Sequence, residues 1–224
     1  MSVNVYSQGV KMELDGKKIN FMGDSITEGY GASGKDRIFS SLIAADIGAV
    51  CRNYGIAGTR IAKQSNPSAD PSWDRDFCSR VAEMDADADI IVVLGGTNDF
   101  GHGDAPFGSF DDKTSDTFCG ALNVLCTNLI ERYPGKIIVI ATPLHRCDEE
   151  WRRPDSGADL RAYVGAIRKA AEYYSLPVLD LWAMSGLQPN LPVIQEKFMP
   201  DKLHPNDAGH RIIADRIIGC LKVL

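Results

Sequence analysis

Hydrophobic residues follow two alternating patterns along the chain. Short, almost continuous apolar runs are typical of buried strands, and residues 89–94 are the clearest example because five consecutive positions are apolar. Segments with apolar residues three and four positions apart predict helices, most clearly over residues 114–133. The predicted strands are 18–22, 50–54, 89–94, 136–142 and 177–181. The predicted helices are 37–47, 73–84, 114–133, 156–174 and 206–221, with Ser72 capping the second and Pro205 in the first turn of the last.

This alternation of strands and helices predicts an α/β fold with a parallel sheet. Because no change of composition, linker or repeat divides the chain, we expect one domain over residues 1–224. Connections from a predicted helix to the next strand have two to four residues, whereas those from a strand to the next helix have 13 to 23. The longer connections leave a parallel sheet at its carboxyl edge, where ligands bind in open α/β sheets. We therefore expect the active site at this edge.

The composition argues against several classes of protein. The 224 residues are 44% hydrophobic and 24% charged, which is close to the globular average and argues against disorder. The formal net charge of −6 disfavours binding to nucleic acid or to anionic membranes, since both need a basic excess. No run of 18 apolar residues is present, so we expect no stable membrane insertion. Residues 1–20 carry five charged side chains and no long apolar stretch, so we expect no secretory signal in this chain and a cytoplasmic protein.

The six cysteines show no C-x-x-C pair and no regular spacing. This distribution is typical of reduced thiols that are mostly buried in a cytosolic protein, and it indicates neither a zinc site nor a disulfide framework. The six are Cys51, Cys78, Cys119, Cys126, Cys147 and Cys220.

Ser25 is the candidate nucleophile. It lies within the sequence Gly-Asp-Ser-Ile-Thr-Glu-Gly (23–29), directly after the first predicted strand, where a hydroxyl group can be exposed to a substrate. Serine needs a base and an orienting acid in order to react, and the alternative is a serine that only stabilises a turn. The chain contains no Gly-x-Ser-x-Gly nucleophile elbow, and Gly29 and Gly31 do not complete a phosphate-binding loop.

Four histidines are candidates for the base, and three of them follow an aspartate by three residues. His210 lies within the last predicted helix, so we expect only a surface contact with Asp207. His204 follows Asp201 and precedes a helix N-terminus, which disfavours the imidazolium form and keeps a neutral base. His102 lies on another long connection and remains an alternative, either as the base or as a substrate contact. The four are His102, His145, His204 and His210.

Two further loops offer hydrogen-bond donors for the oxyanion of an acyl-transfer reaction. Gly58 lies in Asn-Tyr-Gly-Ile-Ala-Gly-Thr-Arg (53–60), where the missing side chain lets a backbone N–H approach a substrate. Asn98 lies in Gly-Gly-Thr-Asn-Asp (95–99), after the third predicted strand, and offers its side-chain amide. Ordinary turn formation is the alternative for each loop taken alone.

Ser25, Gly58, Asn98 and His204 occur in this order on four separate connections. Together they resemble the SGNH hydrolases, the GDSL esterase/lipase family, which is named after these residue types. The first motif reads Gly-Asp-Ser-Ile in place of Gly-Asp-Ser-Leu and keeps an apolar fourth position. The last motif is Asp-Lys-Leu-His-Pro (201–205), so the motifs extend over residues 23–205.

The resemblance implies a three-layer α/β/α sandwich with a five-stranded parallel sheet of the flavodoxin-like type. It implies that Ser25 is the nucleophile, His204 the general base and Asp201 the residue that orients it. The backbone N–H groups of Ser25 and Gly58 and the side-chain amide of Asn98 would form the oxyanion hole. The implied activity is that of a serine ester hydrolase, which forms an acyl-enzyme from a small-molecule ester without a metal or an organic cofactor.

Other loop residues concern the substrate. We interpret Asp24 and Asp99 as carboxylates that brace their loops. The candidate substrate contacts are Asp24, Phe100, His102, Arg146 and Trp151. Among these, an indole face stacks on rings and a guanidinium group donates in pairs, which suits a sugar or an acidic group. No long apolar flap is present, so we expect short acyl groups, such as the acetyl groups of acetylated carbohydrates.

Three alternatives remain open at this point. The first is a lysophospholipase-type or thioesterase-type acyl hydrolase, and the second is an acyltransferase that uses the same residues. The third is a non-catalytic binding module or a metal protein that uses Asp99, His102 and Asp104. The third is disfavoured because it leaves the catalytic motifs unexplained.

Overall fold

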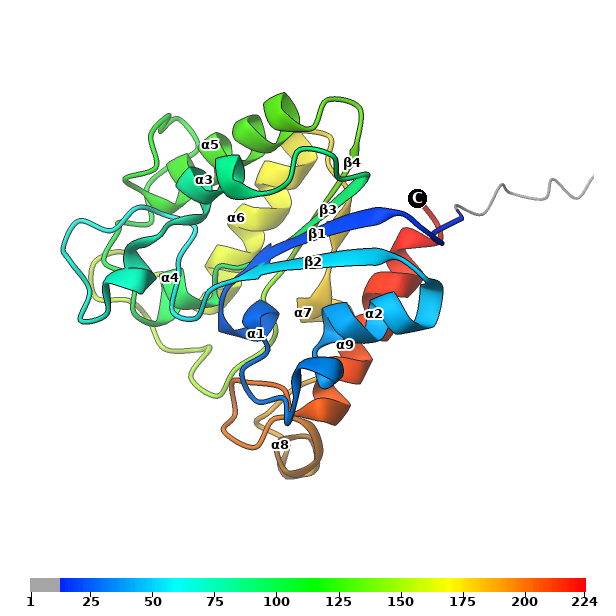
Figure 1. Ribbon diagram of the computed structural model, residues 1–224. Helices are drawn as coiled ribbons and strands as arrows, with labels where there is room; N and C mark the ends of the chain where they lie inside the picture. Colours follow the sequence, from blue (N-terminus) through cyan, green and yellow to red (C-terminus); the bar gives the residue numbers. More distant parts are fainter. Residues whose placement is uncertain (1–12) are drawn as a thin grey trace, which may run out of the picture.

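A five-stranded parallel sheet forms the centre of the protein (Figure 1). The structure is a computed structural model that describes residues 13–224. The strands are β1 (Lys18–Gly23), β2 (Val50–Gly55), β3 (Ile90–Leu94), β4 (Ile137–Ala141) and β5 (Val178–Leu179). Their order is β2-β1-β3-β4-β5, and every neighbouring pair is parallel. This is the strand order of flavodoxin-like, doubly wound sheets.

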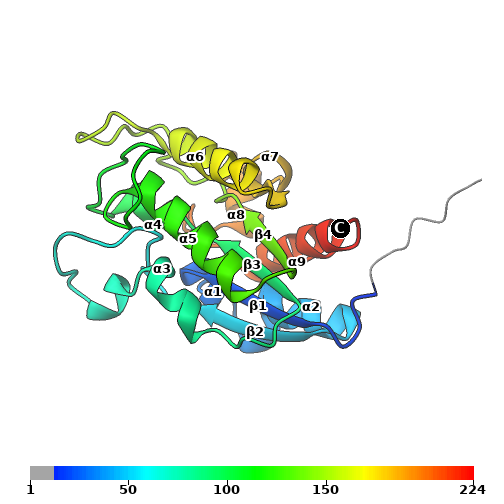
Figure 2. The same cartoon turned by 90° about the horizontal axis from the view of Figure 1, so that it is seen from above.

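Helices cover both faces of the sheet. They are α1 (Ser25–Glu28), α2 (Phe39–Ile47), α3 (Phe77–Arg80), α4 (Thr97–Gly101), α5 (Phe118–Arg132), α6 (Leu160–Tyr173), α7 (Leu181–Met184), α8 (Pro192–Phe198) and α9 (Asp207–Leu221). Short 3₁₀ helices are η1 (Lys35–Arg37), η2 (Pro71–Asp74) and η3 (Val81–Glu83). Figure 2 shows α5 and α6 on one side of the sheet, whereas α2 and α9 lie on the other. The three-layer α/β/α sandwich predicted from the sequence is therefore confirmed.

Strand β3 shows how one sheet serves two cores. All five of its side chains are buried, and successive side chains point to opposite faces. Ile91 and Val93 join the core under α5 and α6, while Ile90, Val92 and Leu94 join the core under α2 and α9. A strand that is covered on both faces needs a continuous apolar run, which is the pattern seen in the sequence.

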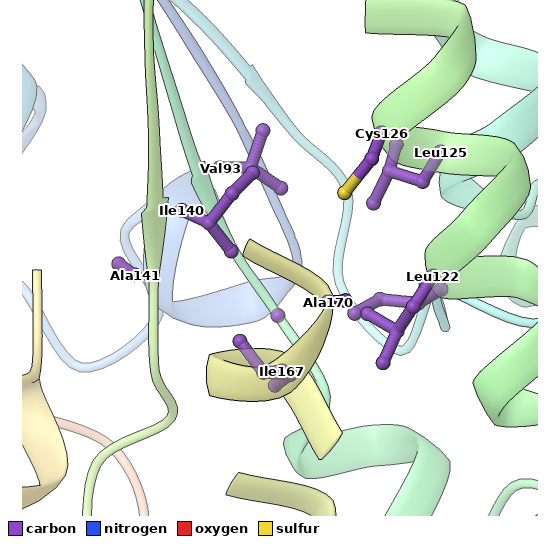
Figure 3. A pocket seen from close by; sticks show the side chains of 10 residues that line it. Val93, Leu122, Leu125, Cys126, Ile140, Ala141, Ile167 and Ala170 are labelled. Atoms are coloured by element: carbon purple, nitrogen blue, oxygen red, sulfur yellow. The ribbon is translucent and has the colours of Figure 1, made fainter. Parts of the chain in front are cut away.

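The core between the sheet and helices α5 and α6 is closely packed. A cavity of about 10 Å³ remains there. Figure 3 shows apolar side chains around it, such as Val93, Leu122 and Ile167. This volume suffices for at most a single water molecule, and the apolar lining offers it few polar partners. A substrate must therefore bind elsewhere.

Capping side chains move several element boundaries away from the predicted positions. The predicted helix 73–84 is divided into η2, α3 and η3, because Asp70 and Asp76 each accept a backbone N–H and begin a new turn. Ser72 is not a cap, because its hydroxyl and backbone N–H both donate to Asp70. Asp180 caps α7, so the fifth strand is shorter than predicted.

The sequence predicts no stable membrane insertion. No helix within residues 13–224 is long and apolar enough to cross a membrane. The prediction that residues 1–20 form no secretory signal concerns a segment of which residues 1–12 lie outside the described residues.

The cysteines differ in exposure: three are buried, two are half-buried and Cys147 is exposed. The buried three are Cys78, Cys119 and Cys126.

His210 differs most from its sequence interpretation. It was expected at the surface, but it is fully buried, and its ring stacks on Phe39 with the centroids 5.9 Å apart. Asp207 instead accepts hydrogen bonds from the backbone N–H and the hydroxyl of Ser33, at 2.7 and 2.6 Å. The physical reason is the helix period, because His210 belongs to the buried stripe of α9. That stripe includes His210, Ile213, Ala214, Ile217 and Leu221.

The burial of His210 predicts a pH-dependent stability. Burial lowers the pKa of His210 from 6.5, so the folded protein binds fewer protons than the unfolded chain. The neutral form of His210 therefore contributes its full stability above the ordinary pKa of 6.5, and this contribution is lost as the pH falls below that value. We expect the free energy of unfolding to fall more steeply from about pH 7.5 to about pH 5 in the wild type than in His210→Leu, measured by urea denaturation. Equal slopes would contradict a buried, neutral His210.

Candidate active site

Strands β1 and β3 are neighbours in the sheet, and the connections that follow them lead to strands on opposite sides of this pair. After β1 the chain passes through α1 and α2 to β2, and after β3 it passes through α4 and α5 to β4 on the other side (Figure 1). A crevice forms outside the carboxyl ends of such strands, and ligands bind there in open α/β sheets. Ser25 follows β1 and Asn98 follows β3, so both candidate residues lie at this crevice.

The turn between β1 and α1 presents Ser25. Ser25 is the first residue of α1, and Asp24 caps this helix by accepting the Ile26 N–H at 3.0 Å. A β-carbon at Gly23 would lie 1.9 Å from the hydroxyl oxygen of Thr27, so glycine is needed at the end of the strand. The backbone N–H of Ser25 belongs to the first turn and has no partner within the helix. Ser25 therefore brings both a hydroxyl group and a backbone donor to the crevice.

Two consecutive hydrogen bonds connect Ser25 with Asp201. Ser25 Oγ lies 3.0 Å from His204 Nε2, and His204 Nδ1 lies 2.6 Å from Asp201 Oδ2. The other oxygen of Asp201 accepts the backbone N–H groups of Leu203 and His204, at 2.9 and 2.7 Å. Lys202, inside this turn, has a φ of 66°, a left-handed conformation that few non-glycine residues adopt. The turn therefore holds the carboxylate against the imidazole ring.

The charge of Asp201 determines which ring nitrogen of His204 carries the proton. Burial alone raises the pKa of Asp201, but hydrogen bonds from the backbone and ring of His204 and from the Leu203 N–H hold this pKa below its usual value. The ionised carboxylate accepts the proton on Nδ1, which leaves Nε2 free to accept the hydroxyl hydrogen of Ser25. The ring of Tyr30 lies against the imidazole, with the centroids 4.4 Å apart, and restricts its rotation.

Gly58 and Asn98 bring further donors to the same place. Gly58 has a φ of 75°, and a β-carbon there would lie 2.3 Å from the indole ring of Trp73, so glycine is required for two independent reasons. The side-chain amide of Asn98 donates one hydrogen to the carbonyl oxygen of Thr59 at 3.0 Å. This bond orients the amide, whose second hydrogen remains for another acceptor.

A cleft of about 410 Å³ brings Ser25, Gly58, Asn98 and His204 together. The residues that complete its walls are aromatic, cationic or small, apart from one leucine. They are Tyr30, Ala57, Trp73, Gly101, His102, Arg146 and Leu203. Asp201 is not among the lining residues, because it lies behind His204.

Two of the five candidate substrate contacts, His102 and Arg146, line this cleft. Asp24 and Phe100 do not, because they are 1% and 0% exposed and serve as a helix cap and as part of the core. Trp151 is 47% exposed, but its ring lies edge-on against Phe100 and outside the cleft lining. The sequence therefore indicated loops that border the cleft without showing which of their side chains line it.

Trp73 and Tyr30 are cleft residues that the sequence analysis did not single out. Trp73 lies in the segment for which a regular helix was predicted, and Tyr30 lies in the first long connection. The available signal was the presence of an aromatic residue near a carboxyl-edge connection, which is too common to identify a site.

His102 has properties that do not suit the alternative base. Burial, together with the positive charges of Arg60 and Arg146, lowers the pKa of His102 to about 4, so its ring is neutral and weakly basic. The carboxylate three residues upstream, Asp99, is engaged elsewhere and accepts the backbone N–H groups of residues 61 and 62, at 3.0 and 2.9 Å. Asp99 therefore braces the loop that follows Gly58.

The carboxylates of the alternative metal site are likewise engaged in loop contacts. Asp104 accepts the backbone N–H groups of Ser65 and Asn66, both at 2.8 Å. No group of three or more histidine, cysteine or carboxylate side chains that could hold a metal ion occurs within residues 13–224. The geometry therefore favours loop stabilisation over metal binding for Asp99 and Asp104.

Comparison with known proteins identifies the family. The sequence model of the GDSL-like lipase/acylhydrolase family matches residues 21–212. The chain belongs to this family. Membership implies an ester hydrolase, and the matched range contains all of the cleft residues described above. No curated protein matches the chain.

Solved structures show how widely this GDSL fold is shared. One crystal structure is 33% identical, covers 95% of this chain and 99% of its own chain, and superposes with a TM-score of 0.81. A protein from Lactobacillus plantarum is 30% identical, with coverages of 92% and 97% and a TM-score of 0.79. An acetyl xylan esterase is 21% identical, with coverages of 90% and 98% and a TM-score of 0.64, and shares the fold.

The two cleft histidines should differ sharply in a hydrolysis assay. We expect His204→Ala to lower kcat for p-nitrophenyl acetate by about 10³-fold, since a general base typically contributes about 10²–10⁴-fold. His102→Ala should lower kcat by less than about tenfold, because only His204 is hydrogen-bonded to Ser25. Thermal unfolding of both variants controls for loss of structure. A larger loss at His102 would overturn this assignment.

Proposed function

We propose that this protein is a serine ester hydrolase that forms an acyl-enzyme on Ser25. The observation that carries the proposal is the hydrogen-bonded series Ser25–His204–Asp201, with Oγ–Nε2 and Nδ1–Oδ2 distances of 3.0 and 2.6 Å. A serine becomes nucleophilic when an imidazole accepts its proton and a carboxylate orients that imidazole. Family membership supports the same class of reaction.

In the first half of the reaction, Ser25 Oγ attacks the ester carbonyl carbon and its proton moves to His204 Nε2. The carboxylate of Asp201 stabilises the imidazolium that results. When the tetrahedral intermediate collapses, the bond to the alcohol oxygen breaks, and His204 gives its proton to that oxygen. The alcohol leaves, and the acyl group remains bound to Ser25.

In the second half, a water molecule replaces the alcohol. His204 Nε2 accepts a proton from this water, whose oxygen attacks the acyl carbonyl carbon. Collapse of the second intermediate breaks the bond to Ser25 Oγ, which regains its proton from His204. The carboxylic acid leaves and the free enzyme is restored.

The negative charge of both intermediates needs fixed donors. The N–H groups of Ser25 and Gly58 and the second amide hydrogen of Asn98 supply them within one cleft. Such donors stabilise an oxyanion strongly because they are oriented before the reaction begins.

The cleft lining supports small acyl groups on a polar alcohol. The apolar part of the lining comes from the rings of Tyr30 and Trp73 and from Ala57 and Leu203, and no further aliphatic side chain extends it to bury a long acyl chain. The rings of Trp73 and Tyr30 provide faces for a sugar, while His102 and Arg146 provide polar groups for its hydroxyls. We infer that the substrates are short-chain esters such as acetylated carbohydrates, a class to which the substrate of the acetyl xylan esterase also belongs.

A series of p-nitrophenyl esters from acetate to laurate tests the inferred acyl specificity. We expect kcat/KM to be highest for acetate or butyrate and not to rise towards laurate, because a methylene group that stays in water gains none of the about 0.8 kcal/mol that its burial would contribute. Ser25→Ala should abolish the activity on every ester. An activity that increases towards laurate would favour a lysophospholipase-type or thioesterase-type function instead.

The identity of the acyl acceptor is a separate question. We expect water to be the preferred acceptor, so that free acetate accounts for most of the product when an acetyl ester is hydrolysed in the presence of added sugars. Chromatographic quantification of acetate and acetylated sugar measures this ratio. A predominance of acetylated sugar would identify an acyltransferase that uses the same residues.

A further inference from the structure

Arg80 is a buried arginine beside the strand ends that carry the cleft. It is the last residue of α3 and only 2% exposed, and its guanidinium group lies over the ring of Phe77, 5.2 Å from the centroid. Its three hydrogen-bond acceptors within residues 13–224 are all uncharged. They are Thr59 Oγ1 at 3.0 Å, the carbonyl oxygen of Gly23 at 3.3 Å and the carbonyl oxygen of Tyr54. Carboxylates such as Glu83 and Asp24 favour its charge without a hydrogen bond to it, but burial outweighs them. The burial of this guanidinium group is therefore unfavourable for stability alone and needs another explanation.

Thr59 extends these contacts to the rest of the cleft. Its hydroxyl accepts from Arg80 and donates to the carbonyl oxygen of Ile56 at 2.7 Å, which closes the loop around Gly58. Its carbonyl oxygen accepts the side-chain amide of Asn98 at 3.0 Å. One residue therefore fixes both the loop of one donor and the side chain of another.

The contacts of Arg80 thus reach all three donors of the proposed oxyanion hole. The carbonyl of Gly23 lies two residues before Ser25, whose N–H is the first donor. Thr59 directly follows Gly58, the second donor, and holds Asn98, the third. Ser25 is therefore two residues along the backbone from an acceptor of Arg80, and Gly58 is one residue away. Asn98 is connected to Arg80 through Thr59 alone.

The charge of Arg80 persists at neutral pH. Burial lowers the pKa of Arg80 to about 10, which still leaves the guanidinium group protonated near pH 7. Arginine presents several N–H groups in a rigid planar fork, so it can hold three acceptors at fixed angles, which a lysine cannot do.

We propose that Arg80 is the positioning residue of the oxyanion hole, which aligns the donors on Ser25, Gly58 and Asn98 through Gly23 and Thr59. The inference rests on the proposed ester hydrolase function and adds a residue that lies outside the cleft. Donors that bind an oxyanion act mainly in the transition state, so a loss of alignment slows acylation more than it weakens substrate binding.

The test uses single-turnover acylation by p-nitrophenyl acetate, which separates the maximal acylation rate from the half-saturating ester concentration. The variants are Arg80→Met, Thr59→Val and Thr59→Ser. Valine has nearly the shape of threonine but lacks the hydroxyl that Arg80 binds, whereas serine retains it. Arg132→Met is the matched control, because Arg132 also donates to a backbone carbonyl, that of Met84, but at the amino edge of the sheet.

We expect Arg80→Met to lower the maximal acylation rate by about 10²-fold and Thr59→Val by about tenfold, since one lost oxyanion donor costs about 10²–10³-fold. The half-saturating concentration and the pH profile of acylation should remain close to those of the wild type. Thr59→Ser should restore most of the rate. The double variant should lose less than the product of the two single losses, because the residues act in one network.

A purely structural role gives a different result. In that case Arg80→Met and Thr59→Val lower the melting temperature as Arg132→Met does, while the acylation rate of the folded protein stays at the wild-type value. This result would overturn the proposal. If Arg80→Met does not fold, Thr59→Val and Thr59→Ser decide, and equal rates for wild type and Thr59→Val overturn it.

The same experiment separates this inference from the proposed function. If the wild type shows no acylation that depends on Ser25, the ester hydrolase proposal fails, and the role of Arg80 fails with it. If Ser25→Ala abolishes acylation while Arg80→Met and Thr59→Val leave its rate unchanged, only the role of Arg80 is wrong.

Discussion

The hydrogen bond between Ser25 and His204 joins residues that are 179 positions apart, and the proposed chemistry depends on it. Each end is fixed by a local turn: Asp24 caps the helix that begins with Ser25, and Asp201 accepts two backbone N–H groups in the turn before His204. The turns meet only because β1 and α9 pack in the same layered fold. At an Oγ–Nε2 distance of 3.0 Å, a proton can pass between the two side chains without further rearrangement.

Buried polar groups support the cleft from behind. Burial raises the pKa of Asp24 to about 7 and that of Asp99 to about 6, although backbone N–H groups lower both values. Both carboxylates accept hydrogen bonds from backbone N–H groups near the cleft, and the guanidinium group of Arg80 donates to the hydroxyl of Thr59. Such groups contribute little to stability, but they fix the positions of neighbouring loops, which is what preorganised donors require.

Features that depend on short stretches of sequence, such as buried strands and family motifs, could be predicted from the sequence. Residues 89–94 read as a buried strand, the order of four short motifs indicated the family, and the lengths of the connections indicated the sheet edge at which the candidate site lies. The sequence did not predict which loop side chains point into the cleft, because this depends on contacts between distant segments, such as that of Trp73 with Gly58. His210 was misplaced because a polar residue on the buried stripe of a helix resembles a surface residue when it is read locally.

The central claim is that Ser25 carries the acyl group during turnover. The most direct measurement is to mix the protein with an excess of p-nitrophenyl acetate, quench with acid within the first turnover and map the peptides by mass spectrometry. We expect one acetyl group on the peptide that contains Ser25, and none in the Ser25→Ala variant. An acetyl group on another residue, or hydrolysis without any covalent adduct, would contradict the account.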